Sequence, residues 1–311
     1  KTEGHITESW EREYKKKNFL RGVLSGISGM IRFGMLVTIL VMGVIAWTRR
    51  HFNVWVFTLF LSAFILISFL SSGLMMNATF NQFPTSEPLS NLLLITVIGV
   101  FLVSLFNGFM YGISAGYLTW VPLPYERNES FFTLKGVGLG VAWAAVIALV
   151  KGDIFRQSPM VLAPGQLDSL LPLLSTVTGT VEEYFMLLVR LLAPMTIAFI
   201  LWKKSKAGAL ILLFVSGFMF AGRLEPGWWA LAGVVAGTII TLLYYYVLRY
   251  NILYIPIMVA VVMILDAVRY MIAAPAVLSL PDGFIRIILT VGLGTVTVWG
   301  MYSLSLIKRD T

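Results

Sequence analysis

Long apolar runs separated by short polar loops fill most of this sequence, and they restrict the chain to a membrane-embedded fold. A helix needs about 20 apolar residues to cross roughly 30 Å of hydrocarbon. We predict about nine spans, and these lie at 30–48, 53–76, 91–118, 134–150, 180–202, 207–222, 227–248, 252–273 and 283–306. The expected fold class is therefore all-α, a polytopic transmembrane helix bundle.

The composition excludes a water-soluble alternative. The chain has 311 residues, of which 58% are hydrophobic and only 12% are charged. Soluble domains contain roughly 25% charged residues. Too little polar surface remains to cover a soluble protein of this size, so we predict an integral, multi-pass protein. If the chain is bacterial, the expected location is the inner or plasma membrane.

The net charge of +8 does not indicate a nucleic-acid partner. The basic residues gather beside apolar runs, where Lys and Arg meet lipid headgroups and set topology. These clusters are Lys15–Lys17, Arg49–Arg50, Lys203–Lys204 with Lys206, and Lys308–Arg309. The partner that this pattern predicts is the lipid bilayer, together with other membrane subunits or the transmembrane helix of a partner protein.

The sequence contains few residues that could bind a metal or act as a thiol. Cysteine is absent, which excludes disulfides, thiolate nucleophiles and Cys-ligated metal centres. The two histidines, His5 and His51, both lie in polar segments. We therefore predict no metal site and no cofactor.

The chain divides into three predicted segments. Residues 1–29 form a polar to amphipathic N-terminal segment, expected to lie at the membrane interface. Residues 30–166 carry the N-terminal transmembrane helices, and 167–311 form a C-terminal transmembrane core. A short re-entrant or interfacial helix at 168–178 is expected to lead into the fifth span.

Charged side chains inside the apolar spans are the most informative feature. Insertion scales assign about 2.5–3.5 kcal/mol to such a residue at a helix centre. The sequence places Glu182, Glu183, Arg190, Asp266 and Arg269 in apolar surroundings, with Arg223 at a span end. Adjacent glutamates point about 100° apart on a helix, so at least one is expected to face the protein interior. Asp266 and Arg269 are three residues apart and can form an ion pair.

Smaller signals favour helix packing. Glycines in GVGLG (136–140), GLGT (292–295) and at 26–29 indicate close approach between helices. Asn107, inside the third span, predicts an interhelical hydrogen bond rather than a ligand. Trp228–Trp229 and Tyr244–Tyr246 are typical of an interfacial aromatic belt.

Three stretches together resemble a known family. TVEEYFMLLVRLL (180–192), GFMFAGRLEPGWWALAGVVAG (217–237) and VLRYNILYIPIMVAVVMILD (247–266) follow the order of the three motifs of the CAAX protease and bacteriocin-processing (CPBP) family. This family contains the type II CAAX prenyl endopeptidases, which are intramembrane glutamic proteases. The resemblance implies a protease-like core in the C-terminal half.

The resemblance also implies site residues, and several are replaced. Glu182 and Glu183 match the paired glutamates, one of which activates water in the family. The two family histidines fall on Gly222 and Ala260, and the motif arginine falls on Leu187. Peptide hydrolysis needs a base and donors to the oxyanion, and one lost donor costs roughly 10²–10³ in rate. The pattern predicts a degenerate site.

Three functions remain in competition. The first is a pseudoenzyme, a non-catalytic binding or structural subunit of a membrane complex that keeps the protease-like scaffold. The second is an active glutamic-type intramembrane endopeptidase with a rearranged site, using Glu182 or Glu183 as base with Arg190 or Arg223 as electrophile. The third is a transporter or ion-pathway protein whose relay comprises Glu182, Glu183, Arg190, Asp266 and Arg269.

Overall fold

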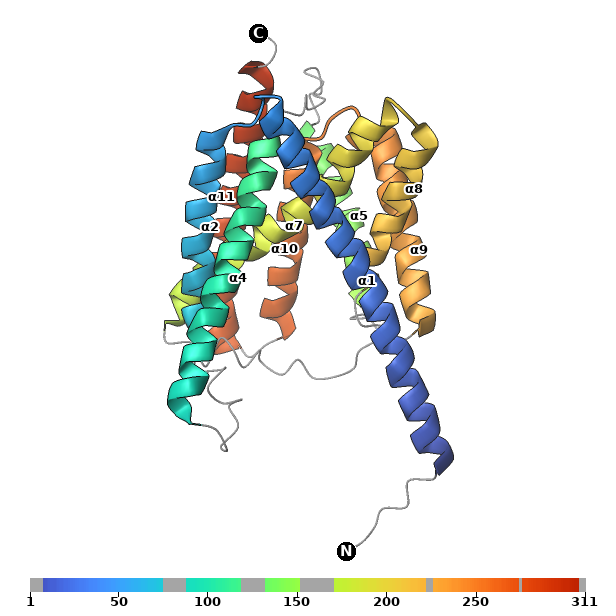
Figure 1. Cartoon of the computed structure of the whole chain (residues 1–311), viewed down its shortest axis with the longest axis vertical. Helices are drawn as coiled ribbons and strands as arrows, with labels where there is room; N and C mark the ends of the chain where they lie inside the picture. The colour runs from blue at the N-terminus through green and yellow to red at the C-terminus, as the bar shows by residue number, and fades with distance from the viewer. Residues whose placement is uncertain are drawn as a thin grey trace, which may run out of the picture. The chain divides into compact units, whose positions relative to one another are not determined.

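The computed structural model describes residues 8–74, 88–118, 132–151, 171–221, 226–273 and 276–307 (Figure 1). All the elements in these ranges are helical. They are α1 (Glu8–Thr48), α2 (Val54–Leu74), α4 (Leu89–Leu118), α5 (Phe132–Lys151), α7 (Pro172–Trp202), α8 (Lys206–Ser216), the 3₁₀ turn η1 (Gly217–Met219), α9 (Pro226–Leu243), the π-helical turn η2 (Tyr244–Leu248), α10 (Tyr254–Ala273) and α11 (Ala276–Ile307).

The prediction of a helical membrane bundle is confirmed in its coarse form. Within the described ranges, 7 helices are long and apolar enough to cross a membrane. Each predicted span falls on a helix, but two of the apolar segments are shorter, at Leu134–Ala148 and Lys206–Met219. The chain is thus described as a multi-pass membrane protein, and the number of spans stays a prediction.

Two helices begin earlier than the sequence pattern indicates. α1 runs without a break from Glu8 to Thr48, so the predicted boundary between residues 29 and 30 falls inside a helix. α7 begins at Pro172 and continues to Trp202, so no separate short helix ends near residue 178. Proline suits the first turn of a helix because its missing N–H has no intrahelical partner there. The predicted boundary at 166–167 lies outside the described residues.

The chain forms two compact units, which share three of its helices. The first unit comprises Lys1–Val37, Ala145–Gln157 and Pro194–Arg249, and the second comprises Thr38–Ala144, Ser158–Ala193 and Tyr250–Thr311. The division within α7 falls at Pro194, which lies inside the helix. Since proline has no N–H, the carbonyl of Arg190 loses its usual helical donor at this point.

In the first unit, α8 and α9 pack closely because glycine faces glycine. A Cβ atom on Gly217 would collide with the backbone of Gly237, and one on Gly237 would collide with the carbonyl oxygen of Phe214. Figure 1 shows the two helices side by side. Small residues permit this backbone approach in membranes, where the hydrophobic effect does not drive helix association.

The end of α8 and η1 is closed by side chains from α1. Ser28 Oγ donates to the carbonyl of Phe218 at 2.9 Å, and Arg32 donates through Nε and Nη2 to the carbonyl of Met219 at 3.0 and 2.6 Å. The last carbonyls of a helix lack intrahelical donors, and an apolar environment supplies no water to replace them. Ser28 and Arg32 therefore stabilise a helix end that follows only a short apolar segment.

In the second unit, a glycine face on α4 brings α2 close. Gly108, Gly112 and Gly116 recur every fourth residue, and a Cβ on each would press against Ile65, Phe57 or Phe52. This repeat sets the distance between α2 and α4, and with it the positions of the polar residues described below. The glycines of 136–140 behave as predicted at two positions, since Gly136 packs against Ile257 and Gly140 against Val261.

Candidate functional site

The paired glutamates lie on α7, and the structure separates their roles. Glu182 is partly buried and points to α2 and α4, whereas Glu183 is exposed. The prediction that at least one glutamate faces the protein interior is confirmed. The separation follows from helical geometry, because consecutive side chains point about 100° apart.

Glu182 belongs to a triad of hydrogen-bonded side chains from three helices. Its Oε1 accepts a hydrogen bond from Ser68 Oγ at 3.1 Å and another from Asn107 Nδ2 at 3.2 Å. Asn107 Nδ2 also donates to Ser68 Oγ at 3.1 Å. The predicted interhelical hydrogen bond of Asn107 is therefore confirmed, and the triad links α2, α4 and α7.

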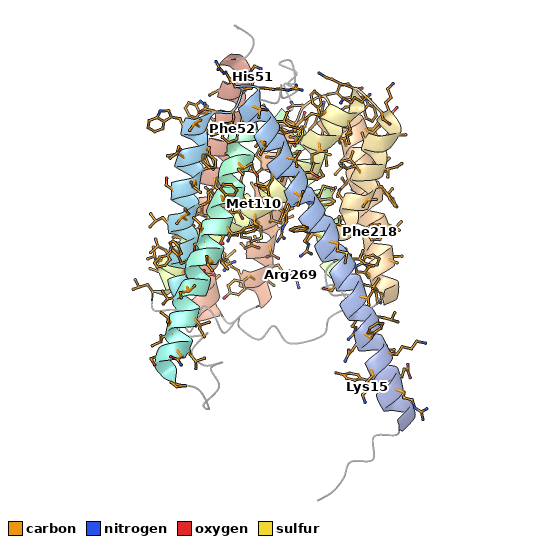
Figure 2. All side chains as sticks on the ribbon, in the orientation of Figure 1. Lys15, His51, Phe52, Met110, Phe218 and Arg269 are labelled. Atoms are coloured by element: carbon orange, nitrogen blue, oxygen red, sulfur yellow. The ribbon has the colours of Figure 1, made fainter. Side chains whose placement is uncertain are left out.

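Aromatic rings form a layer one helical turn away from the triad. Phe64 lies one turn from Ser68, Tyr111 one turn from Asn107, and Phe185 three residues after Glu182. The ring of Phe64 is 4.3 Å from that of Tyr111 and 4.9 Å from that of Phe185, measured between centroids. Figure 2 labels Met110, the neighbour of Tyr111, on α4. Phe64 and Tyr111 are buried, so this layer excludes water from one side of the triad.

Arg190 is a second charged residue that the sequence predicts for this region. Arg190 is partly buried on α7, two turns beyond Glu182. Glu182 and Arg190 are thus two partly buried charged residues on the same helix.

Tyr184, on the side of α7 opposite Glu182, packs on α10 and α11. Tyr184 is fully buried, and its hydroxyl forms a 2.7 Å hydrogen bond with Thr297 Oγ1 and donates to the carbonyl of Pro256 at 3.4 Å. Ala260, the position of a family histidine, is also buried, and the nearest neighbour of a Cβ on Gly294 would be its methyl group. The partners of Glu182 thus come from α2 and α4, and Ala260 packs towards α11.

The remaining predicted residues lie elsewhere. Asp266 is exposed on α10 and Arg269 is partly buried one turn later, and their ion pair stays a prediction. Gly222 and Arg223 lie outside the described residues. Phe218, within the second of the three stretches that resemble the family, packs its ring 4.9 Å from that of Trp229 in the first unit.

A second polar network was not predicted. Thr176 Oγ1 on α7 donates to Asp282 on α11, and Asp282 forms an ion pair with Arg286 at 3.0 Å. The guanidinium of Arg286 lies 5.7 Å from the ring centre of Tyr270 on α10. The four-residue spacing of Asp282 and Arg286 was the available signal, since oppositely charged residues at this spacing face each other on a helix. Ser68 had no such signal, because serine in an apolar helix usually bonds to its own backbone.

No protein-family model, curated protein or solved structure matches the chain. Among the residues that the structure describes, no group of three or more His, Cys, Asp or Glu side chains is placed to hold a metal ion. The site is thus characterised by its own geometry, which is a carboxylate held by two neutral donors beneath an aromatic layer.

Proposed function

We propose that the chain is a non-catalytic subunit of a membrane assembly, built on a CPBP-type scaffold in which the activating glutamate has become a structural carboxylate. One observation carries this proposal. Oε1 of Glu182 accepts hydrogen bonds from both Ser68 and Asn107. A general base must offer a lone pair to water within hydrogen-bond distance of the substrate. Here the carboxylate ties three helices together instead.

The surroundings of the family positions support the same proposal. Ala260 offers a methyl group where the family places an imidazole, so this position can neither donate to an oxyanion nor relay a proton. The aromatic layer of Phe64, Tyr111 and Phe185 keeps water from one side of Glu182. A carboxylate that is hydrogen-bonded to two other helices and covered on one side suits a scaffold better than a hydrolase.

The exposed glutamate supplies the binding function of the proposed subunit. Glu183 lies within the apolar span Leu173–Trp202 and its side chain is exposed. A carboxylate that faces lipid costs about 2.5–3.5 kcal/mol. A partner's transmembrane helix that carries Lys, Arg or an amide or hydroxyl donor would remove this cost. We infer that Glu183 is the contact for such a helix.

Site-specific photo-crosslinking in the native membrane tests this assignment. A photoreactive residue at Leu187, one turn after Glu183, is expected to capture a defined membrane protein, and Glu183→Gln is expected to reduce this product at least about tenfold, since 1.4 kcal/mol corresponds to a factor of ten. Glu182→Gln is the matched control, because it changes the neighbouring carboxylate that faces inward, and it should leave the product unchanged. A chain that carries the photoreactive residue and both glutamates but captures nothing would contradict the proposed binding role.

A cleavage assay tests the non-catalytic part separately. The purified chain is incubated with prenylated CAAX peptides and with unprenylated controls. We expect no cleavage by the unmodified chain above that of the Glu182→Ala/Glu183→Ala double variant. Cleavage that disappears with either glutamate would overturn the proposal and favour the active endopeptidase.

A further inference from the structure

Among the residues that the structure describes, one cationic side chain of the first unit has hydrogen bonds to a carbonyl and no acidic partner. Arg32 on α1 makes both of its described hydrogen bonds to the carbonyl oxygen of Met219. Within the described ranges, no carboxylate lies at ion-pair distance from it. A carbonyl accepts the hydrogen bond but does not neutralise the charge, so the guanidinium keeps its full positive charge beside apolar helices.

The donors of Arg32 are only partly used. A guanidinium carries five N–H groups in a fixed planar fork. The contacts to Met219 use Nε–H and one hydrogen of Nη2, and the remaining donors are held in a fixed direction by these two bonds. The side chain is partly exposed, so a ligand can reach them. Arginine in this arrangement suits oxygen atoms of a phosphate or carboxylate group.

The length of α9 places Arg32 near a membrane boundary. Trp229 Nε1 donates to Ser28 Oγ at 2.9 Å, and Ser28 lies one helical turn before Arg32 on α1. From Trp229 to Leu248 the chain is helical, and at about 1.5 Å per residue this length is about 28 Å, close to the thickness of the hydrocarbon layer. Arg249 follows at the other end. Trp229 therefore lies near the boundary opposite Arg249, and Arg32 lies one helical turn along α1 from the residue that Trp229 contacts.

Other features of this boundary favour an anionic lipid headgroup. Trp228 is half exposed there, as expected for an interfacial tryptophan. The first turn of α9 adds the partial positive charge of a helix N-terminus at the same level. Further along α1, towards its N-terminus, the basic residues Lys15 and Lys16 are exposed, and Figure 2 labels Lys15 near the helix end. They lie about 24–26 Å from Arg32 along the helix axis, so they do not form part of this site.

We propose that Arg32 binds the phosphate group of an anionic phospholipid, with Met219 holding the guanidinium in place and Ser28 and Trp229 holding α1 against α9. The ligand is a phosphodiester with net negative charge and two acyl chains. It lies against the first unit, and the binding is independent of the Glu182 triad and of the proposed partner helix.

Native mass spectrometry of the purified chain tests this site. The chain is delipidated and titrated with phosphatidylglycerol, phosphatidylcholine, diacylglycerol or inorganic phosphate. We expect the tightest binding for phosphatidylglycerol, weaker binding for phosphatidylcholine and no specific binding for diacylglycerol. Free phosphate lacks the acyl chains and is expected not to bind at millimolar concentration. Equal binding of inorganic phosphate, or equal retention of all lipids, would overturn the proposal.

Substitutions separate a direct contact from a structural effect. Arg32→Gln keeps one donor for the Met219 carbonyl but removes the charge, and we expect phosphatidylglycerol to bind about ten- to a hundredfold more weakly, as for a lost hydrogen bond to a charged group. Lys16→Gln removes a charge from the same helix and should change binding less than about threefold. Ser28→Ala weakens the same helix junction but keeps the guanidinium, so it should weaken phosphatidylglycerol binding less than Arg32→Gln does. A loss in Ser28→Ala as large as in Arg32→Gln would refute a direct contact.

Discussion

Alanine at Ser68, Asn107 and Glu182, singly and in pairs, is the most direct test of the polar triad. The triad has three hydrogen bonds, and each side chain takes part in two of them. A single substitution therefore removes two bonds, whereas any double substitution removes all three. Two single substitutions taken separately remove four, because the bond between the substituted residues is counted twice. The double variant must consequently cost less than the sum of the singles.

The magnitude follows from the energy of one bond. At about 0.6 kcal/mol for an interhelical hydrogen bond in a membrane, a single variant should lose about 1.2 kcal/mol of unfolding free energy and a double variant about 1.8 kcal/mol. The coupling energy is then about 0.6 kcal/mol, the value of the shared bond. Bonds to an ionised Glu182 are roughly twice as strong, which would raise the coupling to about 1.2 kcal/mol in pairs that include it.

The assay is reversible unfolding in bicelles by steric trapping, which reports the free energy of unfolding. Ser104→Ala is the matched control, because Ser104 is buried on the same helix as Asn107 but bonds only to the carbonyl of Val100. It should cost less than about 0.5 kcal/mol and show no coupling with Glu182→Ala. Strictly additive doubles within the triad would refute the geometry, as would a coupling of Ser104 equal to that of Ser68.

Three further predictions concern helix packing, all measured by thermal unfolding followed through tryptophan fluorescence. Gly237→Ala should destabilise the chain by about 1–3 kcal/mol because its Cβ would collide with the Phe214 carbonyl; Gly227→Ala, which meets no atom within 4 Å, should cost less than half as much, and equal losses would contradict the close approach of α8 and α9. Asp282→Asn should lower stability by about 1 kcal/mol because it breaks the ion pair with Arg286. Thr176→Val removes a hydrogen bond to the same carboxylate, and a double variant whose loss equals the sum of the two single losses would contradict the network. Tyr184→Phe should cost about 0.6–1.7 kcal/mol because its hydroxyl loses Thr297; Tyr246→Phe, 68% exposed, should have no effect, and a neutral Tyr184→Phe would show that the hydroxyl bond is dispensable.

Helix packing by small residues could be predicted only in part. Glycines 136 and 140 contact Ile257 and Val261, and Gly294 lies against Ala260, as the pattern indicates. Gly26 and Gly29 have no atom within 4 Å of a Cβ position, although Ser28 between them is buried. The repeat on α4, Gly108 with Gly112 and Gly116, was missed, and it is this repeat that sets the distance to α2. A glycine in the sequence shows only that another helix can come close at that position. Whether one does depends on the helix that packs there.

The sequence predicted which residues of the candidate site are important, but not which of them contact each other. Glu182 and Asn107 both stood out, because polar groups are costly within an apolar span. Their contact was not predictable, since 75 residues separate them in the chain. Ser68 gave no signal at all, because an apolar helix accommodates a serine through a bond to its own backbone.

The amino-acid sequence by itself determined that this chain is helical and membrane-embedded. The costs of exposing apolar side chains to water and of burying charges in lipid depend on the composition of each apolar segment, and not on which helices pack against it. The sequence also determined which residues are expensive in that environment. Only the tertiary structure decided that Glu182 faces α2 and α4 while Glu183 faces outward. The reason is that adjacent side chains point about 100° apart, so the choice depends on the rotation of α7, which is set by the packing of Phe185 and Tyr184 against different helices. The hydrogen bonds from Arg32 to the end of η1 were likewise decided by the tertiary structure. A helix end in apolar surroundings needs a hydrogen-bond donor, and here the fold brings one from a residue 187 positions away in the chain.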